Sequence, residues 1–390
     1  MKKSTLKILI VCILIVTTGI SFAVFRYIGA EKLSAYFSAI MFSADFKDKK
    51  PLSTKNYDML DENEKKAYIC IFNNIEKHPE YIKIPTLSQS EFNSVYFAVK
   101  NDNPDMLCFS DSCNMITFLS SCFLQMHYKY QKDICNEMSE TLNAKANSII
   151  DDIDVSDAYS AELAIHDYIV KNCSYVENAE NISNAYGCLI DGEAVCSGYS
   201  RAAMLLLNKA GIDSVLVGGT GISSDGRVIS HMWNIVWIDG YPYHLDVTWD
   251  DPGNAKNTVS HVFFNMTTDQ ISADHKDISL SVDCNATDAN YFVREKTIYT
   301  EYNTDVLQEI MKNLCRNIDN GIYYSEFMFA DSDSYNSAVD SIIDNSKSVS
   351  DMYKIIEYVS ENAKNKVDIS HINFVQEPEK NYIRLMFDEI

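Results

Sequence analysis

Positive charge is scarce in this chain compared with negative charge. The 390 residues include 33 lysines and arginines against 55 aspartates and glutamates, so the formal net charge is −22. A nucleic-acid-binding protein needs a basic patch for the phosphate backbone, and the balance therefore argues against nucleic acid as a partner. Proline is also rare, with seven residues, and no internal repeat or low-complexity tract is present. Strong acidity usually keeps a surface soluble, although it is also compatible with basic substrates.

The eleven cysteines lack the close Cys-x-x-Cys spacing that is typical of a structural zinc site. We predict neither a metal ion nor a cofactor. The pairs Cys108–Cys113, Cys122–Cys135 and Cys173–Cys188 are candidates for disulfide bonds, but spacing alone does not decide connectivity. A chain of this length does not need disulfides as its main framework, and free thiols fit the pattern equally well.

The N-terminus carries a long uncharged hydrophobic run. Ile8–Phe25 follows three lysines and precedes Arg26. This is about the minimum length for a membrane-spanning helix, and the early lysines predict that the remainder of the chain crosses the bilayer. We expect a single N-terminal span that acts as a signal-anchor in the cell membrane, with an extracytoplasmic body. The alternative is secretion after cleavage of a signal peptide near Ser21-Phe22-Ala23.

Three modules are expected after the anchor and juxtamembrane segment, residues 1–50. Residues 55–150 are predicted to be mainly helical, and residues 155–300 to form the core that carries the candidate site. Residues 302–390 are predicted to be a small α/β domain. Its helices are expected at 303–317, 335–346 and 351–364, and its strands near 321–329, 367–375 and 380–387. Roles in binding substrate, wall polymer or a partner, or as a packing lid, stay open for this domain.

A β-hairpin is predicted between residues 229 and 249. The segments 229–238 and 241–249 are rich in β-branched and aromatic residues, and Asp239-Gly240 separates them. Asp-Gly is a strong signal for a two-residue turn, because a type I′ turn needs positive φ at both positions. In that register Ile238 faces Tyr241 and pairing proceeds outward from there.

The same register brings polar side chains together. Trp233 opposes Asp246 and His231 opposes Thr248, and side chains alternate between the two faces of a strand. His231, Trp233, Asp246 and Thr248 therefore share one face, with His231 and Asp246 close enough diagonally for their side chains to meet. Trp233 is either a wall of a binding cleft for substrate or a core residue. His244 has the same parity as Asp246, and a core or surface role is favoured for it.

Cys196 is the candidate nucleophile. It directly precedes a helix expected over 197–210, with Gly211 as the C-terminal stop. Free backbone N–H groups and the helix dipole at such a position favour the thiolate, and they can also stabilise an oxyanion. A thiol, an imidazole and a carboxylate are the parts of a nucleophile, its base and the group that orients the base.

The arrangement resembles the transglutaminase-like superfamily, whose core is shared with papain-type cysteine proteases. The resemblance covers roughly residues 55–300. Within the superfamily, this chain resembles the bacterial surface branch, similar to the kyphoscoliosis-peptidase type, more than it resembles the calcium-dependent cross-linkers. The resemblance implies Cys196 as nucleophile, His231 as general base and Asp246 as orienting group. It also implies an α+β fold with the cysteine at a helix N-terminus packed on an antiparallel sheet. The matching runs are Ala185–Ser200, Gly211-Ile212, Gly218-Gly219, His231–Asn234 and His244–Pro252.

The expected function is that of an extracytoplasmic thiol enzyme acting on peptide or glutaminyl amide bonds through a thioester. Hydrolysis is favoured over cross-linking, because water is always present whereas an amine acceptor needs a binding site of its own. The expected partner is a protein or peptide substrate, including cell-wall peptide. The alternative is a non-catalytic cell-surface binding or scaffold protein that keeps the same fold.

Overall fold

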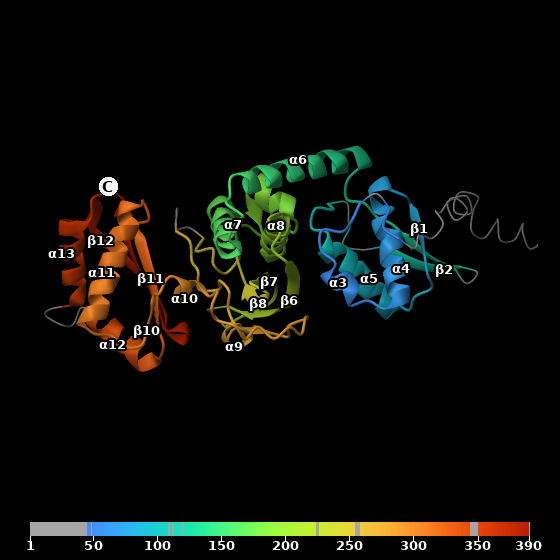
Figure 1. Cartoon of the computed structure of the whole chain (residues 1–390). Helices are drawn as coiled ribbons and strands as arrows, with labels where there is room; N and C mark the ends of the chain where they lie inside the picture. Colours follow the sequence, from blue (N-terminus) through green and yellow to red (C-terminus); the bar gives the residue numbers. More distant parts are fainter. Residues whose placement is uncertain are drawn as a thin grey trace, which may run out of the picture. The chain divides into compact units, whose positions relative to one another are not determined.

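The structure is a computed structural model that describes residues 45–47, 49–107, 110, 113–118, 121–223, 226–253, 258–343 and 350–389, without the side chains of residues 118 and 121. The chain divides into two compact units, with the division between Ala144 and Lys145 (Figure 1). The candidate site lies entirely in the second unit.

The first unit combines helices with a three-stranded antiparallel sheet of order β1-β3-β2. The structure therefore adds a sheet to a module expected to be mainly helical, because strands of four or five residues are too short to show a period-two pattern. The strands are β1 (Tyr81–Ile84), β2 (Asn114–Phe118) and β3 (Ser121–Gln125). The helical segments are α3 (Lys55–Asp58), α4 (Glu62–Phe72), η1 (Ile75–Lys77), α5 (Gln89–Asp102) and α6 (Lys132–Asp151), which runs past the division.

The core of the second unit packs helices on a four-stranded antiparallel sheet of order β8-β7-β6-β9. The central helix α8 (Cys196–Lys209) lies against β6 and β7, and it is buried from Gly198 to Leu207 (Figure 1). The sheet contains β6 (Ser214–Ile222), β7 (Val228–Ile238), β8 (Tyr241–Leu245) and β9 (His275–Lys276). The remaining elements are α7 (Ala158–Asn172), β4 (Ser174–Tyr175), the π-helical turn η2 (Gly187–Asp191), β5 (Glu193–Ala194), α9 (Thr268–Ile271) and α10 (Tyr291–Arg294).

The predicted hairpin is confirmed in type and register. Ile238 pairs with Tyr241, and φ is positive at both Asp239 (52°) and Gly240 (84°), as a type I′ turn requires. The regular ladder ends at the pair Asn234–Leu245, so the predicted pairs Trp233–Asp246 and His231–Thr248 are not formed, and the segment expected to continue as a strand to residue 249 forms a turn instead. Asp246 therefore lies directly beyond the end of β8.

The C-terminal module, residues 298–389, is a four-stranded sheet of order β10-β11-β13-β12 with three helices and its own hydrophobic cluster. The elements expected from periodicity are confirmed within a few residues, because they are long and strongly amphipathic. These elements are α11 (Thr304–Asp319), β11 (Tyr324–Phe329), α12 (Ser332–Ile342), α13 (Asp351–Asn362), β12 (Val367–Glu377) and β13 (Tyr382–Glu389). The short strand β10 (Ile298–Tyr299) and the turn η3 (Pro378–Lys380) were not predicted.

The prediction of a transmembrane signal-anchor has to be corrected. Within the part of the chain that the structure describes, no helix has the length and apolar character to cross a bilayer. The longest one, α6, carries charged residues from Lys132 to Asp151. Ile8–Phe25, on which the predicted cell-membrane span rested, lies outside the described residues. The extracytoplasmic location, inferred from the same segment, stays a prediction.

All nine cysteines that the structure describes are free thiols. The candidate bridges Cys122–Cys135 and Cys173–Cys188 are therefore not formed, and Cys108 of the third candidate pair lies outside the described residues. The thiols of Cys173 and Cys188 nonetheless lie close enough to shift each other's pKa, which is lowered for Cys173 and raised for Cys188. Hydrophobic burial holds this core together without covalent links.

Candidate active site

The start of α8 presents Cys196. Val195 has extended backbone angles and offers no side-chain cap, so the N–H groups of the first turn are left for other partners. Gly198 lets the turn pack closely, because an added Cβ would lie 2.4 Å from the carbonyl oxygen of Ile182. Cys196 itself is partly exposed, unlike most of the other described thiols.

The β7–β8 hairpin brings His231 and Asp246 together as the alternation predicted. His231 Nε2 lies 2.6 Å from Asp246 Oδ2, and both side chains are buried. The other carboxylate oxygen, Oδ1, accepts backbone N–H bonds from Thr248 (3.0 Å) and Trp249 (3.3 Å). These bonds fix the carboxylate within the turn that follows β8.

The Cys196 thiol lies close enough to His231 to contribute to the pKa of its imidazole. Because Nε2 faces Asp246, Nδ1 is the ring nitrogen left for the sulfur. Burial opposes a charged imidazole, but the Asp246 carboxylate and Cys196 outweigh it and raise the pKa of His231 to about 10. Burial also works against the Asp246 carboxylate, yet His231 and a second histidine hold the pKa of Asp246 well below its usual range.

That second histidine is His275, which sequence reasoning missed. Its Nε2 lies 3.0 Å from Asp246 Oδ2, and its Nδ1 lies 2.7 Å from Asp274 Oδ1. Desolvation lowers the pKa of a buried imidazole, but these two carboxylates together raise that of His275. The sequence around His275 contains little that could predict its position, because β9 has only two residues and pairs with the distant end of β6.

Trp233 and His244 lie in the core beneath His231. Trp233 is 1% exposed and donates from Nε1 to His244 Nδ1 at 3.0 Å. Burial and the nearby His275 lower the pKa of His244 to about 4, so this ring is a neutral acceptor. Of the two roles considered for Trp233, its burial fits that of a core residue. Trp249 forms the aromatic wall of the pocket beside His231. Gly221 permits this, because an added Cβ would lie 2.6 Å from the Trp249 ring.

A pocket of about 980 Å³ opens beside His231. Aromatic and apolar side chains form part of its wall, and carboxylates outnumber cations among the rest. One side of the wall is a stretch of the C-terminal module, Gln376–Lys380. The remaining lining residues are Tyr175, Glu177, Ile222, Ser223, Arg227, Ile229, Ser230, Thr248, Trp249, Asp251, Phe263, Ala273 and Asp274.

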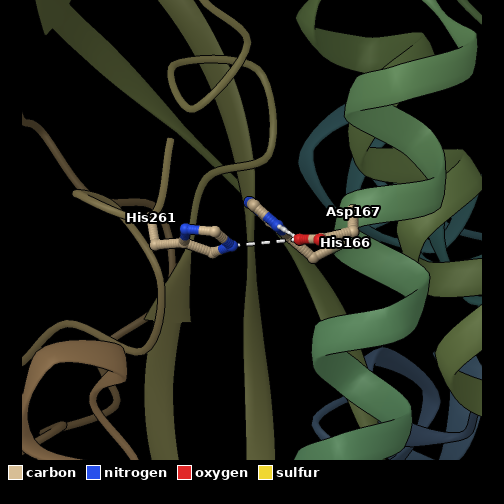
Figure 2. Close-up of side chains that lie close together, drawn as sticks. All are labelled: His166, Asp167 and His261. Atoms are coloured by element: carbon tan, nitrogen blue, oxygen red, sulfur yellow. Dashed lines mark hydrogen bonds and ion pairs between the residues drawn. The ribbon is translucent and has the colours of Figure 1, made fainter. Parts of the chain in front are cut away.

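A second buried cluster lies between α7 and the segment that carries His261. Figure 2 shows the imidazoles of His166 and His261 pointing at the carboxylate of Asp167. Asp167 Oδ1 lies 3.2 Å from His166 Nδ1 and 3.0 Å from His261 Nε2. The other nitrogens face Asp250 (3.2 Å, from His166) and Glu326 (2.7 Å, from His261). This cluster therefore connects the core to β11 of the C-terminal module.

Two histidine–aspartate groups in the described residues have donor types that zinc accepts: His231, Asp246 and His275, and His166, Asp167 and His261. Both ring nitrogens of each histidine already face a carboxylate or, in His231, a carboxylate and the thiol. Each group is thus complete as a hydrogen-bonded ion-pair network. The geometry requires no ion to hold these side chains in place.

Comparison with known proteins adds one informative match. The family model of the transglutaminase-like superfamily matches residues 147–247, a segment that contains Cys196, His231 and Asp246. No curated protein matches the chain. The finer likeness to the kyphoscoliosis-peptidase type stays a prediction.

Three solved structures are similar over part of their length. A candidate cysteine protease from Cytophaga hutchinsonii is 14% identical, with a TM-score of 0.24, over 35% of this chain and 61% of its own. A protein named a TGase is 14% identical, with a TM-score of 0.25, over 45% and 52%. A candidate protease from Parabacteroides distasonis is 11% identical, with a TM-score of 0.22, over 35% and 36%. This chain thus spans less than two thirds of each, and similarity at this level does not indicate a substrate.

The family match agrees with three features of the chain. They are the sequence segments around the three residues, the helix that begins at Cys196 and the antiparallel sheet beneath it. The chain as a whole has the expected α+β fold, with antiparallel sheets in both units. Residues 147–247 of this chain match the family model of the transglutaminase-like superfamily, and this match includes all three candidate residues.

Proposed function

We propose that this protein is a thiol enzyme that attacks an amide carbonyl of a peptide or protein through Cys196, His231 and Asp246. The observation that carries the proposal is the hydrogen-bonded pair of His231 and Asp246, with the Cys196 thiol next to His231 and with His231 in the wall of a pocket. A partly exposed thiol at an uncapped helix N-terminus is where a thiolate nucleophile is most readily formed.

The proposed reaction has two steps. The Cys196 thiolate adds to the carbonyl carbon, and backbone N–H groups at the start of α8 stabilise the oxyanion. The C–N bond then breaks, the leaving amine takes the proton held by His231, and a thioester to Cys196 remains. Water or an amine attacks the thioester, gives its proton to His231 and releases the thiolate.

Hydrolysis is the favoured outcome of the second step. Water reaches an open pocket without a dedicated site, whereas transfer to an amine needs a second binding site next to the thioester. The acidic balance of the pocket wall suits peptides that carry cationic side chains. Cell-wall peptides with a free side-chain amine fall within this class.

The first experiment measures the rate of iodoacetamide labelling of Cys196 against pH, read by peptide mass spectrometry, in the wild-type protein and in His231→Ala. We expect labelling of Cys196 at neutral pH that is much faster than that of the other thiols and is lost in the variant. Cys113 is an internal reference in the same digest, because burial raises its pKa to about 11 and it is also partly exposed.

Slow labelling of Cys196 that is indifferent to His231 would contradict the proposal and favour the non-catalytic binding alternative. If labelling behaves as expected, a glutaminyl peptide is incubated with and without a primary amine. Mass spectrometry then distinguishes peptide-bond cleavage, release of ammonia and incorporation of the amine.

A further inference from the structure

The turn of the β12–β13 hairpin takes part in the candidate active site although it belongs to the C-terminal module. Gln376–Lys380 forms one wall of the pocket that contains His231. At the end of this turn the ammonium of Lys380 forms an ion pair with Asp274. The same ammonium lies 4.6 Å from the centre of the Phe263 ring, and the side chain is only 11% exposed. Lys380 is therefore a fixed part of the wall.

The contacts continue from Lys380 to the site without a gap. Asp274 Oδ1 lies 2.7 Å from His275 Nδ1, and His275 Nε2 lies 3.0 Å from Asp246 Oδ2. The side chains of His275 and Asp246 are fully buried. Cation and carboxylate alternate along Lys380, Asp274, His275, Asp246 and His231. Each group thus offsets the burial cost of the next one.

Contacts between the C-terminal module and the core fix the position of the β12–β13 turn. Val375, Met328 and Tyr382 of the C-terminal module pack in the hydrophobic cluster of the core. Glu326 of β11 binds His261, and Figure 2 shows His261 turned toward Asp167 of α7. These contacts keep the position of Lys380 constant relative to Asp274.

We propose that Lys380, Asp274 and His275 form a positioning chain that fixes Asp246, and through it His231, so that the C-terminal module is required for full reactivity of Cys196. The proposal rests on the function proposed above. None of the three residues touches the reacting atoms. They act by holding the Asp246 carboxylate in the orientation that His231 needs.

The charges around His275 determine whether the pKa of His231 rises or falls when His275 is replaced. It faces the carboxylates of Asp246 and Asp274, and the rings of His231 and His244 are the other titratable groups near it. Its ring centre lies 5.3 Å from that of His231. His275→Gln takes a titratable ring away from beside His231 and replaces the rigid ring donor to Asp246 Oδ2 with a flexible amide donor. The pKa of His231 should then rise, because Asp246 no longer shares its charge with a second imidazole. The orientation of Asp246, and with it that of the His231 ring, should become less fixed.

The test compares His275→Gln, Lys380→Met and Lys380→Arg, with Lys354→Met as a control that removes an exposed lysine of the same module. We expect Cys196 alkylation at neutral pH to fall about tenfold or more in His275→Gln, and less in Lys380→Met. Lys380→Arg keeps the charge and should restore the rate. Circular dichroism checks that each variant is folded.

A second readout needs no chemistry at Cys196. In a Cys196→Ala background, the imidazole resonance of His231 is titrated by NMR and identified by its loss in His231→Gln. We expect the midpoint to rise by about 0.5 pH unit or more in His275→Gln, and to rise less in Lys380→Met. Unchanged midpoints in folded variants would overturn the positioning chain. An unreactive wild-type Cys196 with shifted midpoints would overturn the proposed reaction and leave the chain supported.

Discussion

At the scale of single residues, the two oxygens of Asp246 have different partners. Oδ1 accepts two backbone N–H groups of the turn, and Oδ2 accepts from His231 and His275. A carboxylate can accept all four bonds, whereas an amide offers only one oxygen. Asp246→Asn must therefore lose either the bonds in the turn or those to the histidines.

Asp246→Asn should lower the pKa of His231 from about 10 toward the ordinary range near 6.5. A histidine whose pKa is raised by folding stabilises the fold fully below its unfolded pKa, and this contribution disappears as the pH rises through the folded value. We expect Asp246→Asn to cost about 3 kcal/mol at pH 6 and clearly less at pH 10. Urea unfolding at the two pH values measures the difference, and an equal cost at both would contradict the assignment.

The pairing of His231 with Asp246 could be predicted because it follows from a period-two pattern and one Asp-Gly turn. His275 could not be predicted in the same way. It reaches Asp246 from a two-residue strand that pairs across the sheet with Gly221, and nothing local encodes that contact. Lys380 is further still along the chain, so its contact with Asp274 depends on how the C-terminal module packs on the core.

At the scale of elements, α7 begins after Asp157, whose side chain caps its first turn. Its buried face, however, carries Glu162 as well as apolar residues. Glu162 Oε2 accepts from Asn265 Nδ2 at 2.7 Å, and Oε1 has no hydrogen-bond partner among the described residues. Helical periodicity assigns glutamate to the solvent side, so this position was not foreseen.

Burial raises the pKa of Glu162 to about 8. Between about pH 4.5 and 8 the unfolded chain ionises this carboxyl while the folded one keeps its proton, so stability falls as the pH rises. Glu162→Gln removes the charge and keeps an oxygen for Asn265. We expect the variant to be more stable than wild type by roughly 2 kcal/mol at pH 8.5, with a much smaller gain at pH 5.

Thermal unfolding at the two pH values tests this, with the exposed Glu357→Gln of α13 as the matched control. A gain that is the same at both pH values would show that the charge of Glu162 is not its cause.

At the scale of the whole second unit, Glu326 joins the C-terminal module to the core. One oxygen lies 2.7 Å from His261 Nδ1, and the other accepts from Tyr382 (2.6 Å) and Arg384 (2.9 Å). Burial disfavours this carboxylate, but Arg384 and His261 lower its pKa to about 2. The prediction of a separate domain over 302–390 stays a prediction, since this segment and the core over 155–300 lie within one compact unit.

Glu326→Gln leaves the buried guanidinium of Arg384 without its carboxylate, and it leaves His261 with Asp167 as its remaining carboxylate partner. We expect a loss of about 3–5 kcal/mol in the free energy of unfolding at pH 7. The stabilisation by Glu326 is present above the ordinary carboxyl range and is lost as the pH falls toward 2, so the difference should shrink at pH 3.

Equilibrium unfolding in urea measures this loss. Lys354→Ala, which breaks an exposed ion pair with Asp351, should cost less than about 1 kcal/mol. A loss no larger than this in Glu326→Gln would show that the ion pairs at this junction contribute little.

The wall of the pocket that comes from η3 has an evolutionary consequence. Pro378 and Glu379 of this turn belong to neither hydrophobic cluster, whereas Val375 and Tyr382 on either side of it pack into the core. Substitutions at the exposed positions Pro378 and Glu379 can therefore accumulate without disturbing the packing beneath the thiol. Descendants of this chain can diversify what they bind while inheriting the same reactive centre.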